Sequence, residues 1–374
     1  MTVKQKIVLI ALSITILLSV TLYSSRDRIT REFFKPTETT TQKGVANSDN
    51  QVIAQDLSIP WEIIELPDNK GVLITERTGN LKLIASESKT FPVSGVEHIG
   101  EGGLLGMALH PDFQNNQWIY IYLTTRSGGN LINRVERYEY DDGTLSGKQL
   151  IIDGIPGASF HDGGRIAFGP DKYLYITTGD AGNESAAQDT KSLSGKILRI
   201  TDEGRTPADN PFGNPVYSYG HRNPQGIAWD SAGQLWSSEH GRSGLESGFD
   251  EINLIKKGSN YGWPVIEGDA TRDGMISPAL HSGPDETWAP GGLAYADGSL
   301  FMGGLRGQTL YQAKIDGEKI STIKANLTGI YGRIRTTVVS SKSNLYVATS
   351  NTDGRGEAGA SDDKLLKFDL RNFK

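Results

Sequence analysis

The residues from His161 to Asp180 read HDGGRIAFGPDKYLYITTGD. Two short apolar runs, RIAF and YLYITT, flank the turn sequence GPDK, which is the pattern of a β-hairpin. A His-Asp pair and two glycines stand directly before the first run. Because strands pack while loops carry chemistry, this placement predicts an ionisable site at one end of a hairpin.

The same layout recurs along the chain at intervals of 45 to 65 residues. Each interval has room for about four strands, which is what one blade of a β-propeller requires. No helical periodicity is sustained after residue 50. We therefore predict an all-β fold, a six-bladed β-propeller of four-stranded antiparallel blades, with an irregular β-sandwich array as the alternative. The strands that follow the six polar turns begin at Val72, Trp118, Tyr173, Leu235, Leu300 and Leu345.

The composition narrows the class of protein. Hydrophobic residues make up 37% and charged residues 22% of the 374 residues, which indicates a packed core. The net charge of −6 argues against a nucleic-acid partner, because neutralising phosphates needs a basic surface. The chain has no cysteine, so disulfides, thiolate catalysis and cysteine-bound zinc are excluded.

The N-terminal residues differ from the rest of the chain. Two lysines precede the apolar run Ile7–Tyr23, so residues 1–25 are expected to be a signal peptide or a membrane anchor. Residues 26–50 are polar and threonine-rich, as in a flexible linker. The propeller is expected to cover residues 51–374. We therefore expect an exported protein that is periplasmic, secreted or anchored outside the cytoplasmic membrane, and that meets the membrane only through this segment.

Propellers bind ligands at one end of the central channel, where loops from all blades meet. Polar residues stand beside the predicted inner strands of most units. Arginines, histidines and amides dominate this set over acids, which suits a small polyanionic ligand held by guanidinium groups. One of the histidines can serve as a general base. The set comprises Glu101, His161, Asp162, Arg222, Asn223, Gln225, Glu239, His240, Trp288, Arg306, Arg333 and Arg335.

Four segments in this order carry a family resemblance: GEGGLLGMALHPDF, HDGGRIAFGPD, YGHRNPQGIAWD and DEINLIKKGSNYGWP. Between about Ser58 and Phe368 the chain resembles the soluble pyrroloquinoline quinone (PQQ)-dependent aldose dehydrogenases of the glucose and sorbosone type. The resemblance implies a six-bladed propeller that oxidises a small-molecule sugar with PQQ and passes the electrons to an external acceptor.

The resemblance also implies roles for single residues. His161 falls on the catalytic base, and Arg222 falls on the arginine beside the reactive quinone oxygens, where a fixed positive charge stabilises a developing oxyanion. The remaining matches are implied to bind or approach the cofactor, and Trp288 is expected to stack on its ring. These residues are Glu101, Asn223, Gln225, Trp288, Arg306, Arg333 and Arg335.

Calcium is the second cofactor that the resemblance implies. In the family, backbone oxygens of a Gly-Pro step hold an active-site calcium, whereas here Gly241 is followed by Arg242, whose cation is unfavourable beside a metal. For a second, structural calcium, the match implies a carboxylate from Glu251 and a carbonyl from Tyr261.

Two other functions remain open at this point. A non-catalytic propeller that serves as a binding module is one, because the Gly241-Arg242 step departs from the family pattern. The other is a calcium-dependent lactonase-type hydrolase, which needs acidic residues around a metal in the channel. The arginine-rich set of candidates favours the dehydrogenase over the hydrolase.

Overall fold

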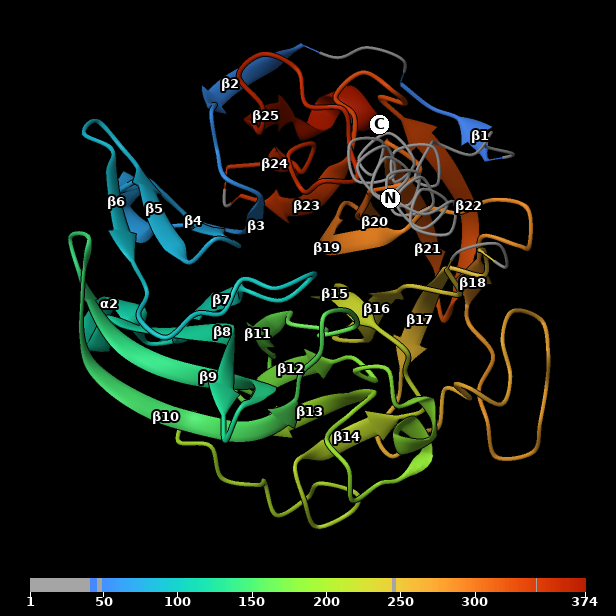
Figure 1. The fold of residues 1–374 in the computed structure, drawn as a ribbon. Coiled ribbons are helices and arrows are strands. Elements are labelled where there is room, and N and C mark those ends of the chain that lie inside the picture. Colours follow the sequence, from blue (N-terminus) through green and yellow to red (C-terminus); the bar gives the residue numbers. More distant parts are fainter. Residues whose placement is uncertain (1–40, 46–48, 244–246, 341) are drawn as a thin grey trace, which may run out of the picture.

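The computed structural model describes residues 41–45, 49–243, 247–340 and 342–374, and it shows six sheets arranged in a ring (Figure 1). The prediction of a six-bladed propeller is confirmed. The first three blades are β3 (Pro60–Glu65), β4 (Val72–Glu76), β5 (Asn80–Ile84) and β6 (Lys89–Pro92); β7 (Leu104–Leu109), β8 (Trp118–Ser127), β9 (Asn130–Asp141) and β10 (Thr144–Pro156); and β11 (Ile166–Phe168), β12 (Leu174–Thr178), β13 (Lys196–Ile200) and β14 (Val216–Tyr219).

The other three blades follow the same antiparallel order. They are β15 (Pro224–Trp229), β16 (Leu235–Glu239), β17 (Glu251–Ile255) and β18 (Leu280–His281); β19 (Pro290–Ala296), β20 (Ser299–Gly304), β21 (Thr309–Asp316) and β22 (Lys319–Asn326); and β23 (Ile334–Val339), β24 (Asn344–Thr349) and β25 (Leu365–Asp369), completed by β2 (Asn50–Ala54). Helical turns are short: η1 (Pro67–Asn69), α2 (Phe113–Asn116), η2 (Glu184–Gln188) and η4 (Leu370–Phe373).

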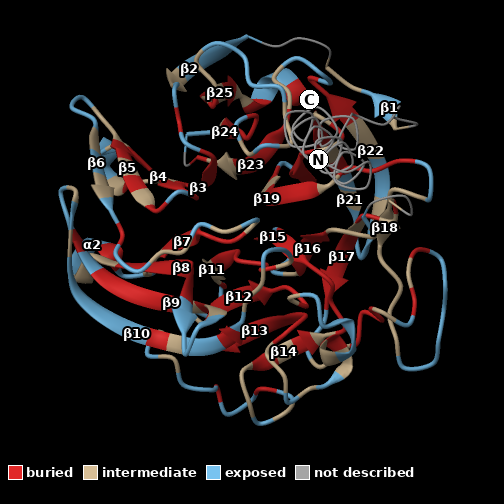
Figure 2. Ribbon diagram, viewed as in Figure 1, coloured by how far each residue is buried: buried red, intermediate tan, exposed pale blue. Residues whose placement is uncertain are grey.

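The six apolar runs that were found by their spacing are the second strands of the six blades. Each predicted start lies within one residue of the start of β4, β8, β12, β16, β20 or β24. Every residue of β4, β12, β16 and β20 is buried, whereas much of the outer strand β10 is exposed (Figure 2). The second strands are covered by neighbouring blades on both faces, which explains why they are continuous apolar runs rather than alternating ones.

The chain ends close the ring. The N-terminal strand β2 pairs antiparallel with the C-terminal strand β25, so the sixth blade contains both (Figure 1). Part of the expected linker is also ordered, because β1 (Gln42–Lys43) pairs parallel with β22. The run Ile7–Tyr23 lies outside the described residues. Within those residues, no helix has the length and apolar character needed to cross a membrane.

The connections of the blades determine where a site can form. In each blade, the first strand starts and the second strand ends at the same end of the ring, because neighbouring strands are antiparallel. The loops that join one blade to the next therefore meet the loops between second and third strands. His161 lies on a loop of the first kind, before β11, and Arg306 lies on one of the second kind, after β20.

A buried ion pair crosses the central channel below these loops. Glu62 of β3 pairs with the Nη1 of Arg165, which precedes β11 two blades away, and both side chains are buried. The Nε of Arg165 donates to the carbonyl of Gln225 at 2.9 Å. Its guanidinium carbon lies 4.1 Å from the ring centre of Trp61. This pair therefore ties three blades together at the axis.

Replacing Arg165 with methionine should lower the free energy of unfolding by about 3 kcal/mol, because the Glu62 carboxylate stays buried without its cation. Burial raises the pKa of Glu62, with Arg165 as the main opposing effect, so the variant should raise it further. Because a carboxyl with a raised pKa is protonated more readily in the folded state, the loss of unfolding free energy should become smaller as the pH falls. Denaturant unfolding at pH 5 and pH 8 tests this, with Arg126→Met at an exposed ion pair as the control. An equal loss at both pH values would contradict the assignment.

Candidate functional site

A cavity opens between the loops at the end of the ring described above. It brings together eight of the residues singled out from the sequence, including the second histidine His240, with seven further residues that include Arg355. The lining residues are Glu101, His161, Arg222, Asn223, His240, Arg242, Ser243, Ser247, Asp250, Thr287, Ala289, Leu305, Arg306, Arg333 and Arg355.

His161 is held by a buried carboxylate. Its Nδ1 lies 2.8 Å from Oδ1 of Asp180, whose Oδ2 accepts from the indole of Trp263 at 2.9 Å. Burial would raise the pKa of Asp180, but the hydrogen bond and charge of His161 outweigh it and the pKa falls below its usual value. The ionised carboxylate keeps a proton on Nδ1 of His161, which leaves Nε2 as a proton acceptor.

Glu101 joins the backbone of His161 to the opposite wall of the cavity. Its Oε2 accepts from the amide of His161 at 3.0 Å, and its Oε1 accepts from Nη1 of Arg355 at 2.8 Å. Burial would raise the pKa of Glu101, but the charge of Arg355 outweighs it and holds the pKa well below its usual range. Glu101 is therefore a charged residue at neutral pH.

Arg222 presents unused donors in a buried position. The residue is 7% exposed, and its Nη2 reaches Ser243 only at 3.4 Å. Its Nε and Nη1 have no hydrogen-bond partner among the described residues. Its guanidinium carbon lies 5.3 Å from the ring centre of Trp263. A buried donor without a partner costs about 1–3 kcal/mol, so this side chain is arranged for an acceptor that enters the cavity.

Two further arginines line the cavity with partners of their own. Arg333 pairs through Nη2 with Oδ2 of Asp353 at 2.8 Å, and its Nη1 donates to the carbonyl of Leu305 at 3.3 Å. The Nη1 of Arg306 donates to Ser247 at 2.6 Å, and burial lowers the pKa of Arg306. The wall therefore carries fixed positive charge on several sides.

Gln225 and Arg335 lie outside the lining of the cavity, although both were expected at the cofactor. The Nη1 of Arg335 donates to Oε1 of Gln225 at 2.6 Å, and the Nε2 of His240 lies 3.2 Å from the same oxygen. Burial lowers the pKa of Arg335 to about 9 and that of His240 to about 3. The two predicted residues are directed at each other along the inner strands, and they hold a neutral His240 in the cavity wall.

Trp288 corrects a prediction from the sequence. It is 1% exposed and packs against Tyr311 with ring centres 5.4 Å apart, in the core between the fourth and fifth blades. Its indole nitrogen donates to Glu286 at 2.9 Å. A side chain covered in this way presents no face on which a ligand can stack, whereas its neighbours Thr287 and Ala289 do line the cavity.

The predicted metal ligands divide into two places. Gly241 and Arg242 lie beside the cavity, where Arg242 pairs with Glu267 at 2.7 Å and its guanidinium carbon lies 4.9 Å from the ring centre of Trp263. Glu251 is paired in register with Glu239 across β16 and β17. Burial, and then Glu239, raises the pKa of Glu251 well above its usual value.

Other features bear on a metal at these places. The backbone amide of Tyr261 donates to Tyr219 at 2.8 Å, and its hydroxyl donates to Leu254 at 2.5 Å. The described part of the chain contains no group of three or more histidine, aspartate or glutamate side chains that could hold a metal ion. A calcium ion here would therefore depend on backbone oxygens in addition to Glu251.

Asp250 and Arg355 line the cavity, although neither was among the candidate cofactor-binding residues. Asp250 accepts from the amides of Gly241, Trp288 and Ala289 at 2.7–2.9 Å, and burial raises its pKa to about 6. The sequence allowed two interpretations of Asp250, an acid in a turn or, together with Glu251, a metal ligand. Arg355 lies in the glycine-rich loop after β24, where neither strand spacing nor the resembling segments gave a signal.

Comparison with known proteins identifies the family. The family model described as Glucose / Sorbosone dehydrogenase matches residues 57–365. Aldose sugar dehydrogenase YliI of Escherichia coli is 33% identical over 359 residues, which cover 86% of this chain and 93% of that protein. Quinoprotein glucose dehydrogenase B of Acinetobacter calcoaceticus is 37% identical over 260 residues, which cover 59% of this chain and 53% of that protein.

A solved structure agrees with these matches. The PQQ-bound aldose sugar dehydrogenase of Streptomyces coelicolor has a TM-score of 0.80 and 41% sequence identity, and the match covers 87% of this chain and 99% of that one. The family match, the identities and the shared fold lead to one conclusion: the chain belongs to the glucose/sorbosone dehydrogenase family.

Proposed function

We propose that this sugar dehydrogenase oxidises an aldose at its anomeric carbon with PQQ bound in the cavity, and that it does so outside the cytoplasm. The observation that carries the proposal is Arg222, whose buried Nε and Nη1 lack partners in a wall that also contains Arg306 and Arg333. The PQQ named for the Streptomyces coelicolor protein, a flat molecule with several carboxylates, suits such donors.

The residues of the cavity fit this group. Arg222, Arg306 and Arg333 would hold the negatively charged edges and oxygens of the cofactor, and Asn223 would support it from the same loop as Arg222. When bound, the quinone supplies the acceptor for the hydride that leaves the anomeric carbon. The donor set is rich in cations and amides, which is the chemistry that a polyanionic quinone requires.

The chain's own residues handle the proton. Nε2 of His161 would take the proton from the anomeric hydroxyl, and the buried carboxylate of Asp180, 2.8 Å from Nδ1, would stabilise the imidazolium that forms. The guanidinium of Arg222 would oppose the negative charge that develops on oxygen during the reaction.

The proposal is tested by reconstitution. The purified chain is incubated with PQQ and calcium, and then assayed with a panel of aldoses and a dye as electron acceptor. Dye reduction that depends on both the aldose and PQQ is expected. Tight PQQ binding without turnover would overturn the proposal in favour of a binding module. Turnover of a lactone with metal alone would overturn it in favour of a hydrolase.

Location and electron acceptor belong to the same proposal. The apolar run Ile7–Tyr23, preceded by two lysines, supports export or anchoring on the outer side of the membrane. There an acceptor outside this chain would receive the electrons of the reaction. Fractionation of cells that express the full chain is expected to find it outside the cytoplasm.

We also propose that calcium binds at Glu251 with the backbone carbonyl of Tyr261. The buried pair Glu239 and Glu251 supports this site, because two facing carboxylates are stabilised by a cation between or beside them. Arg242 next to the cavity is already neutralised by Glu267, which makes this cation less unfavourable for the active-site calcium that the resemblance implies.

Calcium is expected to raise the melting temperature of the metal-free protein, since a ligand at a hundred times its Kd stabilises by about 2.7 kcal/mol. Glu251→Gln should abolish this increase, and Glu318→Gln at an exposed ion pair should retain it. Because protons compete for the raised-pKa carboxyl, the increase should be larger at pH 8 than at pH 5. Scanning fluorimetry with and without chelator measures it, and an unchanged increase in Glu251→Gln would place the ion elsewhere.

A further inference from the structure

The backbone of His161 adopts a conformation that a side chain disfavours. Its φ is 59°, in the left-handed region, which costs roughly 1–2 kcal/mol for a residue other than glycine. Such a conformation persists only where neighbouring groups hold it. Its carbonyl accepts from the amide of Ala181 at 3.2 Å, and its amide donates to Glu101 at 3.0 Å. The orientation of the proposed base therefore depends on Glu101.

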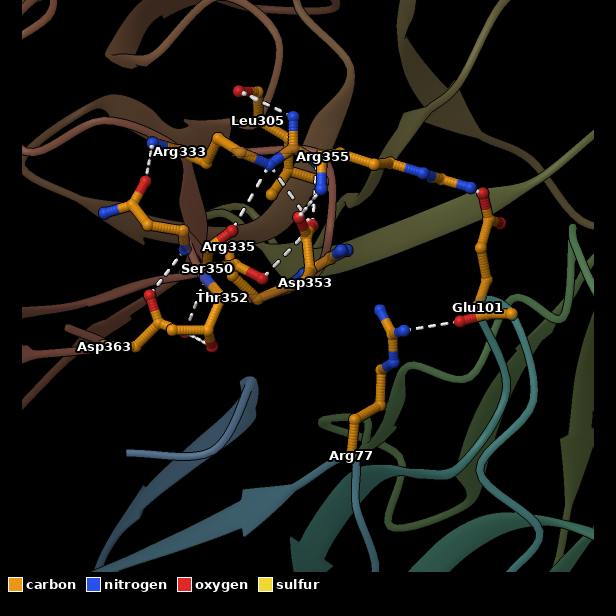
Figure 3. A network of polar contacts seen from close by, with 12 residues as sticks. Arg77, Glu101, Leu305, Arg333, Arg335, Ser350, Thr352, Asp353, Arg355 and Asp363 are labelled. Atoms are coloured by element: carbon orange, nitrogen blue, oxygen red, sulfur yellow. Dashed lines mark hydrogen bonds and ion pairs between the residues drawn. The ribbon is translucent and has the colours of Figure 1, made fainter. Parts of the chain in front are cut away.

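Glu101 is itself fixed from two sides. Its amide donates to the carbonyl of Ser159 at 3.0 Å, and at the preceding Gly100 a Cβ would lie 1.9 Å from the same carbonyl oxygen. On the other side, its carboxylate pairs with Arg355 at 2.8 Å. Figure 3 shows the Arg355 side chain reaching across to Glu101 from the opposite group of residues. The ion pair with Arg355 therefore fixes the position of the Glu101 carboxylate.

The loop that carries Arg355 also holds an arginine of the cavity. The amide of Arg355 donates to Oδ1 of Asp353 at 2.9 Å, and Oδ2 of Asp353 pairs with Arg333 at 2.8 Å (Figure 3). At Gly356 a Cβ would lie 2.6 Å from Cδ of Arg333, so the loop packs directly on that side chain. One short stretch after β24 therefore contacts both sides of the cavity.

We propose that Arg355 is a positioning residue for the base. Its ion pair attaches the loop after β24 to Glu101, and Glu101 then keeps the backbone of His161 in the conformation that directs the ring into the cavity. This inference rests on the role of His161 in the proposed function. Arg355 transfers no proton itself. The competing explanation is that Arg355 acts by contacting the cofactor directly.

Hydrogen–deuterium exchange on the cofactor-free full chain separates the two explanations. In Arg355→Gln, the amides of residues 157–163 should exchange about tenfold faster, because a charge-assisted bond in the chain of contacts is lost. In the PQQ-loaded enzyme, kcat should fall by a similar factor of about ten while the KM for the aldose changes little. Arg355→Lys keeps the charge and should recover most of both.

A matched control is available on the same loop as Glu101. Arg126 of β8 pairs at 3.3 Å with Glu97, which lies on that loop, and within the described part of the chain its hydrogen bonds go to Glu97 and Gly129, so Arg126→Gln should leave the exchange of residues 157–163 unchanged. Wild-type exchange in Arg355→Gln, or weakened PQQ binding without faster exchange, would overturn the proposal. If Arg355→Gln does not fold, exchange in Arg355→Lys that equals wild type while kcat falls tenfold would also overturn it.

The experiment distinguishes this inference from the proposed function. Exchange is measured without cofactor or sugar. A wild-type chain that fails to oxidise aldoses would therefore refute the proposed function but not the positioning role of Arg355. An active wild type together with unchanged exchange in Arg355→Gln would refute only the positioning role of Arg355.

Discussion

Replacing His161 with alanine should lower kcat by about a thousandfold, because a positioned general base contributes about 10²–10⁴ to the rate. The Nδ1 of His161 is committed to Asp180, and among the described residues the other histidine that lines the cavity is His240. His240, in the same cavity, has a pKa lowered to about 3 by burial and binds Gln225 through Nε2. Steady-state dye reduction with saturating PQQ and aldose measures the loss.

Two further measurements separate lost chemistry from lost structure. The variant should bind PQQ within about threefold of wild type, since the proposed role of His161 is to accept a proton and not to hold the cofactor, and added imidazole should restore part of the rate. His110→Ala is the control, because that ring contacts Asp202 and lies after the end of β7, at the opposite end of that strand from the loops that line the cavity. Retention of more than a tenth of the wild-type kcat would show that another group accepts the proton.

Replacing Arg222 with methionine should weaken PQQ binding by about a hundredfold or more, since truncating one partner of a buried charge pair costs about 2–5 kcal/mol. The cofactor-free protein should be equally or more stable, because the variant removes a buried guanidinium whose Nε and Nη1 have no partner. The backbone amide of Arg222 still donates to Glu239, so the loop keeps its anchor.

The two expected effects have opposite signs, because PQQ binding weakens while the cofactor-free protein becomes no less stable. Titration of PQQ by fluorescence quenching gives the affinity, and scanning fluorimetry of the cofactor-free protein gives the melting temperature. Arg199→Met is the matched control, since that buried arginine is paired with Asp171 and Asp209 and should destabilise the protein when removed. A variant at Arg222 that melts much earlier yet binds PQQ normally would show that Arg222 is a structural residue.

The fold could be predicted from the sequence because one strand of each blade is buried on both faces. Such strands appear as apolar runs after polar turns, and all six were located within one residue of β4, β8, β12, β16, β20 and β24. The number of strands in each blade could be predicted because the sequence between successive runs is long enough for about four strands. The closure by β2 and the short edge strand β1 gave no comparable signal, because exposed outer strands are mixed in composition.

The site was predicted less evenly, and depth explains the difference. Residues at the very start of an inner strand or on the loop before it, such as His161 and Arg222, do line the cavity. A shift of one or two residues along the strand takes a side chain out of the cavity lining, as at Gln225, Arg335 and Trp288. Arg355 could not be found from strand positions, since its contact with Glu101 arises from loops more than 250 residues apart in sequence.

The pairing of β2 with β25 has a consequence for biosynthesis. The ribosome makes β2 among the first strands and β25 last, so the ring stays open until translation has nearly finished. Arg333 and Arg355 belong to that final blade, and Arg355 reaches Glu101 only when the ring is complete. A nascent or prematurely terminated polypeptide that lacks β25 therefore has no closed cavity, and the proposed activity is expected only once the sixth blade is complete.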